Sequence, residues 1–153
     1  MKYAAVAAAI FAGDFFLKEC IEKQEEEKQE TEICRGRVIL KRYHNKGAAL
    51  NFMEKQPGVV RAVSGAIVLF VGIFWYLLLQ KKENPMVLLG LSLLLGGGAG
   101  NFYDRTARGY VVDYFSFCTP WKKLNQVVFN LSDLCIFLGS LLVVLFGRKI
   151  ESF

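Results

Sequence analysis

Two aspartates at the edges of apolar runs are the residues of this sequence best suited to carry out a reaction. Asp113 lies in GNFYDRTARGYVVDYF (100–115), and Asp133 lies inside VVFNLSDLCIFLG (127–139). Ionisable groups near a membrane core are costly and usually face a cavity or a partner. Two carboxylates that share one proton hold one ionised and one neutral group, which can activate water and polarise a carbonyl. This pair predicts aspartic peptide hydrolysis.

Polar side chains one helical turn apart accompany these acids. Asn130 precedes Asp133 by three residues, so both can lie on one face of a helix. Asn101 falls about one turn before Arg105, and this pair can also point to one side. The alternative is that each acid only forms an ion pair with Arg105 or Arg108. Both interpretations stay open from position alone.

A further acid and two glycines lie in the apolar runs. Asp14 and Lys18 are four residues apart and share a helix face. They predict either an ion pair at the lipid boundary or a contact that holds a loop or a lipid headgroup. Gly96 and Gly100 have the same spacing, which permits close helix approach. The run GGGAGN does not open a βαβ unit, which argues against a dinucleotide-binding loop.

The histidine and cysteine content argues against other hydrolytic sites. The one histidine, His44, lies in a charged segment, so a Ser-His-Asp or Cys-His site lacks a suitable base. There is no HExxH motif and no CxxC pair, and we expect neither a metal nor another cofactor. Cys135 is predicted to pack as a small hydrophobe. Pairing of Cys20 with Cys34 stays open.

The elements that must position these residues are predicted to be membrane helices. Of the 153 residues, 54% are hydrophobic, and the mean hydropathy is +0.32. A bilayer core needs about 20 helical residues. We predict an all-α membrane protein with a four-transmembrane-helix bundle in a single integral membrane domain, residues 1–153. The predicted spans are residues 3–17, 62–79, 86–103 and 127–147.

The first run resembles a signal peptide, with Lys2 ahead of an apolar stretch. We expect a retained helix instead, because Asp14 and the apolar residues 15–17 follow its alanine-rich part.

Four spans place both termini on one side and the polar segments 18–58 and 104–126 on the other. Charge does not fix which side is cytoplasmic, because the segment 18–58 holds many residues of both signs. Residues 33–52 predict a small extracytoplasmic β cradle, with strand propensity at 37–41. Residues 20–32 predict a solvated helix or a mobile linker.

The basic residues do not form a nucleic-acid site. The net charge is +5, but the bases are scattered over short polar segments and are not interleaved with stacking aromatic residues. We therefore expect no nucleic acid, and we expect the headgroups of membrane lipid to contact many of these charges.

The motifs, taken in order, resemble those of the lipoprotein signal peptidase (signal peptidase II) family. Residues 100–115 resemble its N-x-x-D-R-x-x-x-G-x-V-x-D-F box, and FNLSD (129–133) resembles its F-N-x-A-D box. NKGAAL (45–50) is similar to its N-x-G-A-A-F box. Asp14 and Lys18 match its D-x-x-x-K pair. The resemblance covers most of the chain.

This resemblance implies an intramembrane aspartic endopeptidase of the bacterial cytoplasmic (inner) membrane, multi-pass with both termini cytoplasmic. The implied substrates are diacylglyceryl-modified prolipoproteins, cleaved before the lipidated cysteine. Globomycin-like cyclic peptides are the implied inhibitors, and we expect a monomer. The implied catalytic residues are Asp113 and Asp133. The implied substrate-binding or supporting residues are Asn45, Asn101, Arg105, Asn130, Asp14 and Lys18.

Several features depart from the family's pattern. Ser132 stands where alanine is usual before the second aspartate, and it adds a hydroxyl beside that acid. Tyr114 replaces the phenylalanine after the first aspartate, and Leu50 stands where phenylalanine is usual. The Glu-rich segment 22–32 is longer and more charged than the family's usual first loop, and its role stays open.

Two functions without hydrolysis are alternatives. A non-catalytic membrane protein that binds lipidated proteins or inhibitors would use the acids as ion-pair partners. A transporter or proton channel would place acids along several spans, whereas here they gather at one end.

Overall fold

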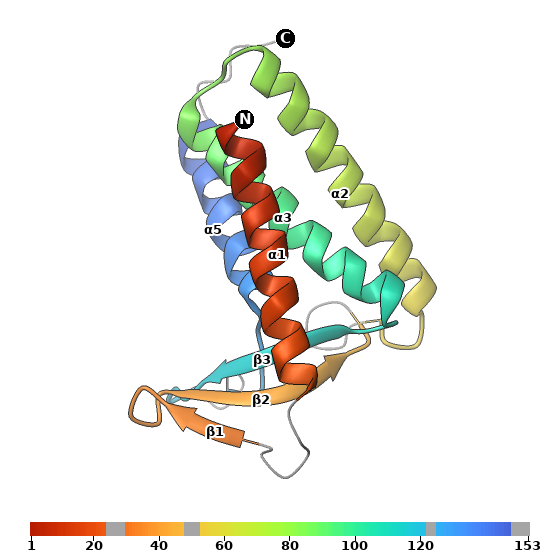
Figure 1. The fold of residues 1–153 in the computed structure, drawn as a ribbon, viewed down its shortest axis with the longest axis vertical. Helices are drawn as coiled ribbons and strands as arrows, with labels where there is room; N and C mark the ends of the chain where they lie inside the picture. Colours follow the sequence, from red (N-terminus) through yellow and green to blue (C-terminus); the bar gives the residue numbers. More distant parts are fainter. Residues whose placement is uncertain (24–29, 48–52, 122–124, 148–153) are drawn as a thin grey trace.

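The chain folds into helices that lie above a small antiparallel sheet (Figure 1). The computed structural model describes residues 1–23, 30–47, 53–121 and 125–147. The helices are α1 (Lys2–Glu22), α2 (Pro57–Gln80), α3 (Pro85–Ala107) and α5 (Leu131–Phe146). The strands are β1 (Glu30–Ile33), β2 (Val38–Asn45) and β3 (Val111–Phe117). The N-terminus and the turn between α2 and α3 lie at the end of the bundle away from the sheet.

Among the described residues, α2 and α3 are long and apolar enough to cross a membrane, judged by length and composition. They contain the predicted spans 62–79 and 86–103. α2 buries only Val60 and Leu78 within the protein, so most of its apolar side chains are exposed. A continuous exposed apolar surface is typical of contact with lipid. α5 is also apolar and has 16 residues.

α1 extends beyond the predicted span 3–17 and ends at Glu22, which places Asp14 and Lys18 well inside the helix. α5 begins at Leu131, whereas the predicted span begins at 127. The reason is that Phe129 forms an isolated β-bridge with Phe115, which keeps the chain extended up to that point.

α3 is the central helix and packs against the other helices of the described chain through glycines. A Cβ added to Gly96 would lie 2.6 Å from the backbone oxygen of Ala7 in α1. A Cβ on Gly97 would lie 2.6 Å from the backbone oxygen of Ser132 in α5. Glycine therefore lets three helix backbones approach closely, and the close approach predicted from Gly96 is confirmed.

The sheet has the order β1-β2-β3, and both pairings are antiparallel. β2 confirms the strand predicted around residues 37–41, while 48–52 lie outside the described residues. The helix or linker predicted for 20–32 is wrong for residues 30–32, which form β1. Their charged side chains are exposed, as is common in an edge strand. Residues 20–22 continue α1, and 24–29 are outside the described residues.

The cysteines are free in this structure. Cys20 and Cys34 are exposed and do not form the disulfide that the sequence left open. Cys135 is half-buried in α5, in keeping with the predicted packing role.

Candidate active site

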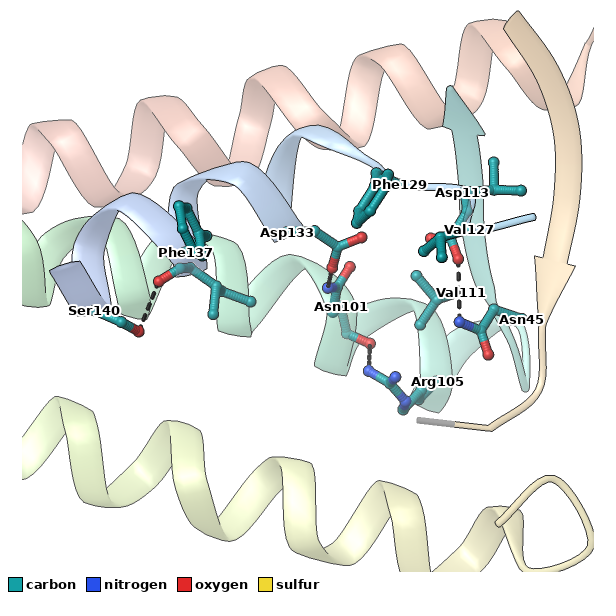
Figure 2. A pocket seen from close by; sticks show the side chains of 12 residues that line it. Asn45, Asn101, Arg105, Val111, Asp113, Val127, Phe129, Asp133, Phe137 and Ser140 are labelled. Atoms are coloured by element: carbon teal, nitrogen blue, oxygen red, sulfur yellow. Dashed lines mark hydrogen bonds between the residues drawn. The ribbon is translucent and has the colours of Figure 1, made fainter. Parts of the chain in front are cut away.

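A cavity of about 400 Å³ lies where α3 and α5 meet β3, and both Asp113 and Asp133 line it (Figure 2). Its wall combines a few polar groups with apolar side chains, which is typical of a binding site for a partly apolar ligand. The lining residues are Asn45, Asn101, Arg105, Val111, Asp113, Val127, Val128, Phe129, Asp133, Ile136, Phe137 and Ser140.

The start of α5 positions Asp133. Asn130 is the N-cap, and its Oδ1 accepts a hydrogen bond from the backbone N–H of Asp133 at 2.8 Å. In return, Oδ2 of Asp133 accepts from the backbone N–H of Asn130 at 3.1 Å. This reciprocal capping box satisfies otherwise unpaired donors and fixes the first turn of the helix.

β3 positions Asp113, which is buried. Its Oδ1 accepts a hydrogen bond from Nδ2 of Asn130 at 2.7 Å. Its Oδ2 accepts from Nδ2 of Asn45, the last residue of β2, at 3.1 Å (Figure 2). The sheet pairing of Asn45 with Val111 brings this amide next to the acid.

Asn101 of α3 connects the second acid to the same network. Its Nδ2 donates to Oδ1 of Asp133 at 2.9 Å (Figure 2). Its Oδ1 accepts from Nδ2 of Asn130 at 3.1 Å. The structure thus brings together two acids that are distant in sequence and joins them through asparagine amides.

The arginines have other partners. Within the described ranges, neither Asp113 nor Asp133 forms an ion pair with an arginine. Nη1 and Nη2 of Arg105 donate to the backbone oxygens of Asn101 and Gly47 at 3.2 and 3.1 Å. Arg105 therefore ties the chain beside Asn45 to α3, while its buried Nε has no hydrogen-bond partner among the described residues.

Asp14 and Lys18 form one of the two predicted contacts, an ion pair, but they lie in the core and not at a boundary with lipid. Their side chains are 0% and 1% exposed, and Nζ of Lys18 lies 2.6 Å from Oδ2 of Asp14. The same Nζ lies 3.0 Å from Oδ2 of Asp104 and 2.9 Å from Oδ1 of Asn101. All three donors of the ammonium group thus have a protein partner.

Asp104 is a residue of this network that the sequence prediction did not include. Its Oδ2 also accepts from the backbone N–H of Val112, next to Asp113, at 3.2 Å. Its Oδ1 lies 3.1 Å from Nε of Arg108, which also pairs with Glu19 of α1. The available signal was the four-residue spacing of Asp104 and Arg108, which places both on one face of α3.

Comparison with known proteins identifies the family. The model of the family described as signal peptidase (SPase) II matches residues 6–147. The chain belongs to the signal peptidase II family. The predicted resemblance is therefore confirmed, and with it the prediction of an enzyme, because this family consists of proteases.

Individual signal peptidase II relatives support the same conclusion. The lipoprotein signal peptidase of Brevibacillus brevis is 32% identical over 139 residues, which cover 91% of this chain and 89% of that protein. That of Alteromonas mediterranea is 35% identical over 104 residues, which cover 67% of this chain and 56% of the relative. The chain thus spans only about half the length of the second relative.

A solved structure of a bacterial membrane enzyme shares the fold, with a TM-score of 0.81. The match covers 98% of this chain and 94% of that one at 20% sequence identity. The mostly helical fold with its small sheet is thus that of a known membrane enzyme.

The electrostatics of this signal peptidase II family member favour a proton on the strand acid. Burial, together with the smaller effect of the charge of Asp133, raises the pKa of Asp113 to about 7. Hydrogen bonds from Asn45 and Asn130, together with the charge of Lys18, act in the opposite direction. Burial has the largest effect on this pKa, because it removes the carboxyl group from water.

The described residues contain no group of three or more His, Cys, Asp or Glu side chains that could hold a metal ion. The polar side chains at the cavity are instead two carboxyl groups, two amides, one guanidinium and the hydroxyl of Ser140.

Proposed function

We propose that the chain is an intramembrane aspartic endopeptidase that removes signal peptides from diacylglyceryl-modified prolipoproteins, cleaving before the lipidated cysteine. One observation carries this proposal. Asp113 and Asp133 line a single cavity, and the side chain of Asn130 hydrogen-bonds to the first acid and to the backbone of the second.

The two acids share one proton, and the ionised one accepts a proton from a water molecule. The oxygen of that water forms a bond to the carbonyl carbon of the scissile peptide. The neutral acid gives its proton to the carbonyl oxygen, so the product of this step is an uncharged tetrahedral diol. The two acids have then exchanged protonation states.

The diol collapses in the second step. One hydroxyl returns its proton to the acid that donated it, and the carbon–nitrogen bond breaks. The other acid protonates the leaving nitrogen. The products are a carboxyl group on the signal peptide and an amine on the lipidated cysteine, and the pair regains its starting state.

The remaining predicted site residues have supporting roles in this proposal. Asn45, Asn101 and Asn130 orient the carboxyl oxygens through their amide groups. Arg105 holds the backbone near Asn45 and faces the cavity, where it steadies substrate or lipid carbonyl oxygens. Asp14 and Lys18 support the site from α1.

The membrane arrangement is part of the proposal. α1, α2, α3 and α5 form four spans of one domain in the bacterial cytoplasmic membrane, with both termini cytoplasmic and the sheet outside. The exposed apolar surface of α2 and the position of the N-terminus away from the sheet support this arrangement (Figure 1). The enzyme acts as a monomer surrounded by membrane lipid.

The cavity wall suggests how the substrate lies. Phe137 of α5 lines the cavity and is 72% exposed, so the site is continuous with an apolar outer surface. The acyl chains of the substrate lie along this exterior, and the signal helix lies between the spans. Globomycin-like cyclic peptides inhibit by occupying the same cavity.

The test uses purified protein in detergent and a diacylglyceryl-modified prolipoprotein, with the unmodified prolipoprotein as substrate control. Asp113→Asn and Asp133→Asn are each expected to lower the cleavage rate by about a thousandfold or more while the protein stays folded. Glu83→Gln, in the turn at the other end of the bundle, is the matched control and keeps the wild-type rate. A wild-type protein that never cuts, with Asp133→Asn lowering only thermal stability, would instead support the non-catalytic alternative.

A further inference from the structure

We propose that Asp14 is a positioning residue that ties together the two segments carrying Asp113 and Asp133, through the hydroxyls of Tyr114 and Ser132. Tyr114 directly follows the first acid, and Ser132 directly precedes the second. This inference rests on the proposed function, because it assigns a role to side chains behind the proposed catalytic pair.

Both hydroxyls donate to the same carboxylate. Oη of Tyr114 donates to Oδ1 of Asp14 at 3.1 Å, and Oγ of Ser132 donates to Oδ2 at 2.6 Å. All three side chains are buried. Hydrogen bonds to a buried charged group are among the stronger ones in proteins, so this carboxylate holds β3 and α5 firmly to α1.

The same groups also complete the start of α5. The backbone N–H of Leu131 donates to Oη of Tyr114 at 2.8 Å. That of Ser132 donates to Oδ1 of Asp14 at 3.3 Å, and that of Asp133 donates to Asn130. The first donors of a helix have no partner within the helix. Here these donors bind side chains from β3, from α1 and from the N-cap, respectively. These three bonds fix the rotation of the first turn and the direction of Asp133.

The hydrogen bond between Tyr114 and Asp14 also affects Asp113, because both Tyr114 and Asp113 belong to β3. Successive side chains of a strand point to opposite faces. Tyr114 reaches Asp14 on one face of β3, while Asp113 lines the cavity. Anchoring Tyr114 therefore restricts the movement of its neighbour Asp113. Burial, with the charge of Asp14, raises the pKa of Tyr114, so its hydroxyl stays protonated as a donor.

α3 leaves space for this cluster at Gly100. A Cβ there would lie 2.8 Å from Oγ of Ser132 and 3.2 Å from Oδ2 of Asp14. The cluster also connects to the acids along a second route. Lys18 binds Asp14 and Asn101, and Asn101 donates to Asp133.

A phenylalanine at 114 and an alanine at 132 would offer Asp14 neither hydroxyl. Both hydroxyls are buried and both donate to one carboxylate, so the geometry points to a joint function.

The test compares Tyr114→Phe, Ser132→Ala and the double variant on the diacylglyceryl-modified prolipoprotein. Each single change is expected to lower kcat about tenfold, because small displacements of reacting groups are expensive, and to leave KM within about twofold. Since both bonds act through one carboxylate, the kcat of the double variant should be only slightly lower than that of the less active single variant. Thermal unfolding in detergent is measured for every variant. Tyr76→Phe and Ser64→Ala, both in α2, are the matched controls and keep the wild-type kcat.

Two results would overturn the inference. The first is a kcat within about twofold of wild type in both single variants. The second is a double variant whose fold-loss in kcat equals the product of the two single losses. If Ser132→Ala does not fold, Tyr114→Phe decides alone through its kcat and KM. A wild-type protein that does not cleave the substrate refutes the proposed function. A wild type that cleaves, with unaffected variants, refutes only the role of Asp14.

Discussion

Nδ2 of Asn130 lies 2.7 Å from Oδ1 of Asp113, and this hydrogen bond joins the start of α5 to β3 beside the cavity. Asn130 is also the N-cap of α5, so one buried side chain both begins a helix and orients an acid on a neighbouring strand. These two tasks use different atoms of the amide. The oxygen accepts from the helix backbone, and the nitrogen donates to the acid.

The two tasks of Asn130 can be separated by substitution. Asn130→Ser keeps an oxygen that can cap the helix, whereas Asn130→Ala removes the cap and is expected to lower the free energy of unfolding by about 1 kcal/mol more. Alanine has no donor, and the serine hydroxyl is one heavy atom closer to the backbone than Nδ2 of asparagine, so it does not reach Oδ1 of Asp113. Both variants should therefore lose about a hundredfold in kcat. Thermal unfolding and cleavage rates measure the two effects. A serine variant with the wild-type rate would refute the orienting role.

Stability should depend on pH through Asp113. Its pKa is raised to about 7 in the fold, whereas an aspartate in an unfolded chain titrates near about 4. Between these values the folded state retains a proton that the unfolded state has lost. The free energy of unfolding should therefore fall as the pH rises from about 4 to about 7, by at most about 1.4 kcal/mol per pH unit.

The measurement is the midpoint of thermal unfolding of wild type and Asp113→Asn across this range. The variant has no such proton, so the wild type should lose stability relative to it as the pH rises. Parallel curves would contradict the raised pKa. In the proposed mechanism one acid must be neutral, so the cleavage rate should also fall above about pH 7.

Lys18 should be essential for folding and not only for activity. Lys18→Met would leave the buried carboxylates of Asp14 and Asp104 without their shared cation. Removing one partner of a buried ion pair typically lowers the free energy of unfolding by about 3–5 kcal/mol. Lys55→Met, at an exposed turn, is the matched control and should unfold like the wild type. Equal midpoints for the two variants would contradict the buried cluster.

The packing of α3 on α5 should not tolerate a methyl group at their closest approach. A Cβ on Gly139 would lie 2.5 Å from the backbone oxygen of Gly90. Gly139→Ala should therefore lower the free energy of unfolding by about 1–3 kcal/mol. Gly58→Ala is the control, because a Cβ there meets nothing within 4 Å, and it should be neutral or stabilising by up to about 1 kcal/mol. A Gly139 variant as stable as the control would refute this packing.

The sequence predicted the parts of the fold that depend on local pattern. Long apolar runs predicted α2 and α3, and strand propensity near 37–41 predicted β2. The placement of Asp113 and Asp133 in one cavity followed from the idea that antiparallel helices bring their ends to one depth. The catalytic roles of both acids stay predictions.

The parts that the sequence did not predict depend on contacts between distant residues. Residues 30–32 form β1 because β2 offers them a neighbouring strand, and their charged sequence gives no sign of this partner. Lys18 lies in the core because Asp104 and Asn101 of α3 receive its donors. No spacing along the chain connects α1 with that part of α3, so the ion pair with Asp14 could be predicted but its burial in the core could not.

In the proposed mechanism, the capping box at the start of α5 makes catalytic competence depend on completed folding. Asp133 adopts its direction only when the first helical turn is wound and the bridge between Phe115 and Phe129 is closed. In the proposed mechanism a partly folded chain therefore holds its two acids apart, and proteolytic activity appears only once the fold around the site is complete.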